Sequence, residues 1–169
     1  RLTYTCGYWR EADNLDAAKE AKLDLVCRKI GLKAGQQVLD IGCGWGSFAG
    51  FAAEHYGAEV FGVTVSKEQG AWVEERYRTL PVRALVKDYR EVGGQFDHAV
   101  SLGMFEHVGP QHFDEYFRTI RKLLTDDGVA VIHSITRAKP NRADPPFVEK
   151  YIFPNGHIPA LSEVLPAIC

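Results

Sequence analysis

The chain has 169 residues and a formal net charge of −2 at pH 7, with 46% hydrophobic and 25% charged residues. This length suits one globular domain with a substantial core. The charge gives no reason to expect a nucleic-acid partner. No apolar run has the length that a membrane-spanning helix needs.

The paired C-x-x-C spacing of zinc and redox sites is absent from the four cysteines, which are Cys6, Cys27, Cys43 and Cys169. We therefore expect free thiols, no metal site and a cytoplasmic location. The first residue is Arg1 rather than Met. We therefore expect the chain to be a piece of a longer protein.

The predicted elements begin with an aromatic, irregular segment over residues 1–13, which we expect to pack over a sheet. Asn14 is a suitable N-cap for a helix over residues 15–30, and Gly31 is a suitable end for it. Apolar side chains recur in this helix at helical spacing, and Lys22 falls within the same stripe.

Five apolar runs, each bounded by glycine, proline or polar residues, then predict strands. They cover residues 38–41, 59–64, 82–86, 96–102 and 129–135, the last introduced by Gly128. Helices are expected over 47–56, after the capping residue Ser66, and along the apolar stripe that starts at Phe113. This alternation predicts an α/β fold: a doubly wound, mainly parallel sheet with helices on both faces.

The tail changes character after the fifth strand. Residues 139–146 are rich in proline and predict a surface loop, residues 151–156 form an aromatic turn, and a short helix is expected near Ser162. A doubly wound sheet of this kind normally finishes with two more strands, which we expect to be missing from this piece. We treat residues 1–169 as one domain, with 136–169 as its loop and tail.

The chain is organised around the stretch 38–46, in which a buried strand runs into a glycine turn. Gly42, Gly44 and Gly46 follow a Gly-x-Gly-x-Gly spacing, which differs from the dinucleotide fingerprint. Asp40 precedes the turn, and a carboxylate there suits a cationic ligand better than a pyrophosphate. S-adenosylmethionine carries an ammonium and a sulfonium, so the pattern favours a methyltransferase-type fold. A tight turn without a ligand is the alternative.

Active residues of such sheets lie in loops at the carboxyl ends of strands. After the second strand, Thr64, Ser66 and Gln69 offer neutral hydrogen-bonding groups for ribose, although Ser66 and Gln69 could serve only to cap a helix. In the next loop, Tyr89 could stack on adenine or cover the sheet edge. Both interpretations stay open on the sequence alone.

Two further polar residues stand in apolar surroundings. Glu106 follows the fourth strand, where a transferase would handle its acceptor, and a buried carboxylate there needs a partner. Bonding to nearby backbone amides is its plainer explanation. His133 lies in the fifth strand, and periodicity alone favours a structural core histidine over a functional one.

The motifs together resemble a known family. The segments at 4–9 (Tyr-Thr-Cys-Gly-Tyr-Trp), 38–46, 62–69, 103–109 (Gly-Met-Phe-Glu-His-Val-Gly) and 151–156 (Tyr-Ile-Phe-Pro-Asn-Gly) look like those of cyclopropane-fatty-acyl-phospholipid synthases and the related mycolic acid cyclopropane synthases. The resemblance runs from Tyr4 to about Leu161. It implies that residues 1–13 cover a bound S-adenosylmethionine.

The resemblance also implies two sets of site residues. A bicarbonate ion, acting as base, would be held near the catalytic residues Cys6, Glu106, His133 and Ile135. The residues implied for cofactor binding are Tyr4, Thr5, Gly42, Cys43, Gly44, Trp45, Gly46, Thr64, Gln69, Asp88 and Tyr89, and we expect Asp40, Ser66 and Leu102 to belong to the same site. No metal is implied.

The expected activity is therefore methylene transfer from S-adenosylmethionine to a cis double bond in a phospholipid acyl chain. The protein would work peripherally at the inner face of the membrane, and the full-length form could be a homodimer. The alternatives are a methyltransferase that stops before ring closure and a non-catalytic nucleotide-binding domain. An NAD-dependent oxidoreductase disagrees with the turn spacing and with Thr64. We expect the 169-residue piece to fold but to be nearly inactive on lipid.

Overall fold

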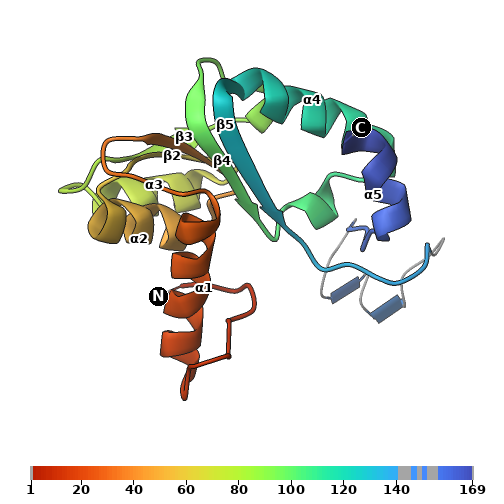
Figure 1. Cartoon of the computed structure of the whole chain (residues 1–169), viewed down its shortest axis with the longest axis horizontal. Coiled ribbons are helices and arrows are strands. Elements are labelled where there is room, and N and C mark those ends of the chain that lie inside the picture. The colour runs from red at the N-terminus through yellow and green to blue at the C-terminus, as the bar shows by residue number, and fades with distance from the viewer. Residues whose placement is uncertain (1, 141–145, 148–149, 152–155, 169) are drawn as a thin grey trace.

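The computed structural model describes residues 2–140, 146–147, 150–151 and 156–168. Five parallel strands form one sheet in the order β3-β2-β1-β4-β5 (Figure 1). The chain moves outward from β1 to one edge and returns to the other side of β1 at β4. The carboxyl ends of β1 and β4 therefore flank the point where the winding reverses, which is where such sheets bind ligands. The strands are β1 (Gln37–Ile41), β2 (Glu59–Thr64), β3 (Val82–Val86), β4 (Phe96–Leu102) and β5 (Leu124–His133).

Helices cover both faces of this sheet, which confirms the predicted fold class. Figure 1 shows α1, α2 and α3 on one face and α4 and α5 on the other. The helices are α1 (Leu15–Lys29), α2 (Ser47–Tyr56), α3 (Lys67–Arg76), α4 (Phe113–Leu123) and α5 (Leu161–Ile168). Short 3-10 turns follow the strands, namely η1 (Tyr89–Glu91), η2 (Phe105–His107) and η3 (Pro110–His112).

The core has two apolar layers, one on each side of the sheet. Val38 packs with α1 and α2, whereas Leu39 and Ile41 pack with the α4 side. Successive strand residues point to opposite faces, so Asp40 shares the face of Val38 and lies beneath α1. This alternation of side chains places Asp40, the one charged residue of β1, on the side of the sheet covered by α1.

The predicted helix ends are confirmed. The Asn14 side chain accepts a hydrogen bond from the Ala17 amide, and the Ser66 side chain accepts one from the Gln69 amide. Gly57 ends α2 in a left-handed conformation with φ 66°. These caps satisfy backbone groups that a helix end leaves without partners.

The fifth strand differs from its prediction at both ends. It begins at Leu124 rather than at Val129, because Leu124 is buried under α4 and pairs with Phe96. The register then shifts between Phe96 and His98, so Gly128 lies inside the strand. The strand stops at His133, which leaves Ile135 beyond its end.

The loop predicted after β4 contains the two turns η2 and η3, and the loop after β3 contains η1. Most of the predicted loop at 139–146 and of the aromatic motif at 151–156 lies outside the described residues. In the described part of the tail, α5 packs against α4, and Arg137 bridges to Ala160. Of the helices described, none combines the length and the apolar character required to cross a membrane.

Candidate functional site

The glycine turn after β1 forms the floor of the candidate site. Gly42 and Gly44 have φ values of 78° and 54°, which side chains rarely adopt. A Cβ at Gly42 would lie 2.7 Å from Met104, and one at Gly44 would lie 3.1 Å from the Tyr4 hydroxyl. The turn is thus packed between the loop after β4 and the N-terminal segment, and its positive φ angles and close neighbours favour glycine at both positions.

Two adjoining cavities open at this turn, and Tyr4, Gly42 and Gly44 line both. The wider one has a volume of about 480 Å³, which is in the range of small-molecule sites. Among the predicted cofactor residues, it is also lined by Thr64, Gln69, Asp88 and Tyr89. The narrow one has about 40 Å³ and is also lined by Thr5, Asp40, Cys43, Trp45 and Leu102. Gly46 and Ser66 line neither cavity, since they begin α2 and cap α3.

The polar side chains after β2 are held in fixed positions. The Thr64 hydroxyl donates to the side-chain oxygen of Gln69 at 2.7 Å, and the Gln69 amide donates to the Ser66 hydroxyl at 3.2 Å. Because its oxygen is occupied, the Gln69 side chain keeps its NH₂ group as a donor at the wall of the wide cavity. Ser66 serves here as a helix cap.

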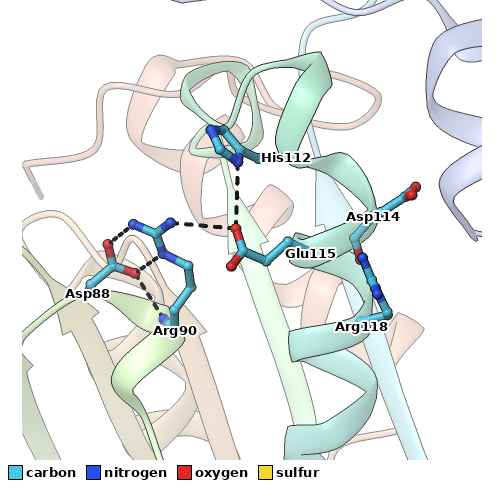
Figure 2. Close-up of polar contacts among 6 residues, drawn as sticks. All are labelled: Asp88, Arg90, His112, Asp114, Glu115 and Arg118. Carbon is cyan, nitrogen blue, oxygen red and sulfur yellow. Dashed lines mark hydrogen bonds and ion pairs between the residues drawn. The ribbon is translucent and has the colours of Figure 1, made fainter.

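An ion-pair network lies at the rim of the wide cavity (Figure 2). The Arg90 guanidinium donates to both carboxylate oxygens of Asp88, at 2.9 and 2.7 Å, and this lowers the pKa of Asp88. Arg90 also lies 3.5 Å from Glu115 on α4, and so does His112. The network therefore joins the loop after β3 to the start of α4. Sequence reasoning missed Arg90, although its position two residues after Asp88 was a usable signal.

Tyr89 contacts the interior as well as the cavity. Its ring meets Tyr116 edge-on, with centroids 5.5 Å apart. Burial raises the pKa of Tyr89. The residue both covers the sheet and lines the cavity, so the two interpretations left open by the sequence are compatible.

The four predicted catalytic residues come from three segments of the chain and form two contacts. The Ile135 amide donates to Glu106 Oε1 at 2.7 Å, and Cys6 Sγ lies 3.5 Å from His133 Nε2. His133 and Ile135 are two residues apart, so the contacts are neighbours. The backbone amide of Ile135 is thus engaged by Glu106.

This cluster contains buried polar atoms without partners. Glu106 is 2% exposed, and among the described residues neither its Oε2 atom nor the Nδ1 atom of His133 has a hydrogen-bond partner. Buried polar atoms are nearly always satisfied, so both atoms are available to a small polar ligand. Phe105 anchors the preceding position by stacking on Phe113 at 4.6 Å, which fixes Glu106 in η2.

Sequence reasoning also missed Lys22 as a site residue. This side chain is 5% exposed, donates to the Thr5 hydroxyl and lines the narrow cavity. Its signal was a lysine inside the apolar stripe of α1. Among the residues with described positions, no group of three His, Cys, Asp or Glu side chains is placed to hold a metal ion.

Comparisons with known proteins agree on one family. The sequence profile described as mycolic acid cyclopropane synthetase matches residues 1–169. The chain is 45% identical to cyclopropane-fatty-acyl-phospholipid synthase of Escherichia coli K12, covering 96% of this chain and 43% of that protein. It is 41% identical to a probable fatty acid methyltransferase of Pseudomonas putida, with coverages of 99% and 46%.

A solved structure of the mycolic acid cyclopropane synthase CmaA1, complexed with SAH and CTAB, superposes with a TM-score of 0.89. It shares 34% identity and covers 98% of this chain and 64% of its own. The chain thus spans less than half the length of both curated relatives above. The fold is that of S-adenosylmethionine-dependent methyltransferases, and the chain belongs to the mycolic acid cyclopropane synthetase family.

Proposed function

We propose that the protein transfers a methylene group from S-adenosylmethionine to a cis double bond in the acyl chain of a phospholipid. The observation that carries this proposal is the buried Glu106 carboxylate, whose Oε2 atom has no partner among the described residues, in the turn after β4 whose residues Met104 and His107 line the glycine-floored cavity. Family membership and the relative named a cyclopropane-fatty-acyl-phospholipid synthase support it. The cluster gives the site a place for a base as well as for a cofactor.

The residues around the glycine turn fit S-adenosylmethionine. The glycines of the turn carry no side chains that would cover its main chain, and α2 begins directly after Gly46, so amides of a helix N-terminus follow the turn. The Gln69 amide group suits a ribose hydroxyl or adenine. Tyr89 offers an aromatic ring in the wall of the same cavity. The solved structure of a relative with bound SAH supports this assignment.

The second cluster fits bicarbonate. The ion has one O–H donor and several acceptor oxygens, which match an unpartnered carboxylate oxygen on Glu106 and a ring nitrogen on His133. When the Cys6 thiol donates to His133 Nε2, the other ring nitrogen, Nδ1, carries the hydrogen and can donate to the ion. Bound there, bicarbonate would accept the proton whose loss lets the ring close.

The chain's own residues prepare the site for a cationic reaction. S-adenosylmethionine supplies an activated methyl group, and its transfer to a double bond leaves positive charge on the lipid. The negative charge of Glu106 lies in an apolar setting, where it stabilises nearby positive charge more strongly than it would in water. Phe105 and Met104 flank this region with apolar groups that exclude water, which would otherwise trap the cation.

Lipid analysis of cells that express the complete gene tests this proposal. We expect phospholipids to gain one methylene group per modified double bond and to show cyclopropane proton signals in the NMR spectrum. The Glu106→Gln variant should lose most of these products, because it removes the charge of the side chain but keeps its shape. Unmodified lipids in cells with confirmed soluble protein would overturn the proposal.

A methyltransferase that stops before ring closure is the second candidate. The Pseudomonas putida relative, named a probable fatty acid methyltransferase, favours it specifically. Its methyl-branched olefin would have the same mass as the cyclopropane, so the two are separated by NMR or by hydrogenation. A non-catalytic nucleotide-binding domain would leave the lipids unchanged.

We also propose that the protein acts peripherally at the inner face of the membrane, because its acceptor double bonds lie within a bilayer. A net charge of −2 gives little attraction to anionic lipid, so we expect weak, salt-insensitive binding to vesicles. Co-sedimentation with vesicles at two salt concentrations tests this. A homodimer of the full-length form is a further proposal, which sedimentation equilibrium tests.

A further inference from the structure

The described part of the tail holds the turn that carries Glu106. Inside η2, the carbonyls of Met104 and Phe105 accept hydrogen bonds from amides three residues further along the chain. The Glu106 carbonyl, at the end of this short turn, instead accepts from the His157 amide at 2.7 Å. A 3-10 turn of three residues is weak by itself. The bond from the tail therefore helps to fix the backbone from which the Glu106 carboxylate projects.

The same glutamate is held a second time through its side chain. The Ile135 amide donates to Glu106 Oε1 at 2.7 Å. Two residues further on, the Arg137 amide donates to the Pro159 carbonyl of the tail at 3.0 Å. The segment after β5 and the tail are thus joined to each other as well as to Glu106. The backbone and the carboxylate of Glu106 therefore both depend on the docking of this tail.

One side-chain contact closes the described tail. His157 Nε2 lies 3.4 Å from Glu163 Oε1 on α5, and the two side chains are only 22% and 23% exposed. Among the described residues Nε2 makes no hydrogen bond, and the Glu163 carboxylate is its ion-pair partner when the ring is protonated. The other oxygen, Glu163 Oε2, accepts from the Ala160 amide at 2.7 Å. Glu163 therefore joins the start of α5 to the residue whose amide holds η2.

The rest of the packing keeps this contact in place. The His157 ring lies against Phe113 on α4, with centroids 6.5 Å apart, and Phe113 stacks on Phe105 in η2. Val164 on α5 is buried in the same apolar layer. A loss of the contact between His157 and Glu163 should therefore loosen the tail and η2 while the sheet remains folded.

We propose that His157 and Glu163 are positioning residues for Glu106. Their contact fixes residues 156–160, the His157 amide in that segment fixes η2, and η2 directs the Glu106 carboxylate toward the proposed bicarbonate. A catalytic group must be held close to its productive geometry to be effective. Neither His157 nor Glu163 lines the two cavities at the glycine turn, so the role concerns the base and not the cofactor. This inference rests on the proposed function for its effect on catalysis.

Kinetics of the complete protein test the role. Cyclopropane formation on vesicles of unsaturated phospholipid is measured over a range of bicarbonate and S-adenosylmethionine concentrations. His157→Leu removes the ring nitrogens. We expect its maximum rate to fall and its half-maximal bicarbonate concentration to rise, each by about 10-fold or more, because small displacements of a catalytic group have large effects. The half-maximal concentration of S-adenosylmethionine should change much less.

Three further variants sharpen the test. His157→Gln keeps an N–H donor near the place of Nε2 and should recover most of the lost rate. Glu163→Gln removes the charge but keeps an oxygen for the Ala160 amide, and it should show a smaller loss of the same kind. The double variant His157→Leu with Glu163→Gln should be no slower than His157→Leu, because both changes act through one contact. His55→Leu, which changes an exposed histidine on α2, should behave as the wild type.

Hydrogen exchange measured by mass spectrometry reports the positioning itself. In His157→Leu and in Glu163→Gln, the amides of residues 156–160 should exchange faster than in the wild type, because the segment opens more often. The amides of β1 and β4 should keep their wild-type rates. Should His157→Leu fail to fold, Glu163→Gln supplies both the kinetic and the exchange comparison.

The outcomes separate this inference from the proposed function. A wild-type dependence on bicarbonate in the folded variants would overturn the positioning role. Additive losses in the double variant would overturn it too, as would an equal rise in the half-maximal concentration of S-adenosylmethionine, which would indicate general loosening of the site. A wild-type protein that forms no cyclopropane would overturn the proposed function. The exchange rates of residues 156–160 would then still decide whether the contact between His157 and Glu163 fixes the tail.

Discussion

Replacing Gly44 by alanine tests whether the glycine turn binds the cofactor. Gly44 has φ 54°, and this left-handed conformation costs a side chain about 1–2 kcal/mol. For a domain of this size each kcal/mol lowers the melting temperature by about 2–4 °C. The ligand-free variant should therefore melt about 2–8 °C below the wild type.

The effect on ligand binding should be larger than this strain. S-adenosylhomocysteine at one hundred times its dissociation constant should stabilise the wild type by about 2.7 kcal/mol, or roughly 5–11 °C. In Gly44→Ala the new Cβ would lie 3.1 Å from the Tyr4 hydroxyl and would occupy the surface that the ligand approaches. The ligand-induced shift should therefore nearly vanish. NAD should shift neither protein.

Gly31→Ala is the matched control. Its φ is 63°, close to that of Gly44, but a Cβ there meets nothing within 4 Å. We expect the same loss in the ligand-free melting temperature and an intact ligand shift. Differential scanning fluorimetry of the three proteins gives all these values. A full ligand shift in Gly44→Ala would refute the assignment of the turn to the cofactor.

Three other changes test separate parts of the structure. Glu106→Gln in the complete protein should reduce ring formation by about 100-fold or more while the thermal shift with S-adenosylhomocysteine persists; lipid analysis and fluorimetry measure the two effects. Burial lowers the pKa of His98 below its usual 6.5, so the unfolded chain binds a proton at this side chain more readily than the folded chain does. The contribution of His98 to the free energy of unfolding is therefore fully present above pH 6.5 and decreases as the pH falls toward the folded-state pKa. In urea denaturation at a series of pH values, His98→Gln should flatten this part of the stability curve. Gly7→Ala would place a Cβ 2.8 Å from that of Ala18, so the N-terminal segment should shift and cofactor affinity should decrease in calorimetry, whereas unchanged affinity would contradict a role for this segment.

Most strands could be predicted because their signals are local. β2, β3 and β4 are apolar runs bounded by glycine, proline or polar residues, and their observed bounds match the predicted ones. The start of β5 could not be predicted in this way. Leu124 becomes a strand residue by pairing with Phe96 and packing beneath α4, and neither contact leaves a periodic pattern in the residues around it.

The candidate site could be predicted where polar residues or glycines directly follow the end of a strand. Parallel strands end at one edge of the sheet, so the residues after β1, β2 and β4 had to lie near one another. The partner of Glu106 could not be read from the sequence, because it is the backbone amide of Ile135 and any residue supplies one. The burial of the Lys22 ammonium could not be predicted from the sequence, because a long side chain in an apolar stripe could equally extend its ammonium to solvent.

The N-terminal segment connects the cofactor cavities with the Glu106 cluster. Three consecutive residues make three different contacts: Tyr4 covers Gly44, Thr5 accepts from Lys22, and Cys6 meets His133. The segment is tied to α1 just beyond these residues, where the Tyr8 amide donates to the Ala18 carbonyl at 2.8 Å. A displacement of the N-terminal segment would therefore disturb the glycine turn, Lys22 and His133 together. Under the proposed function, residues 4–6, which lie outside every described helix and strand, would link cofactor binding to the arrangement of the proposed base.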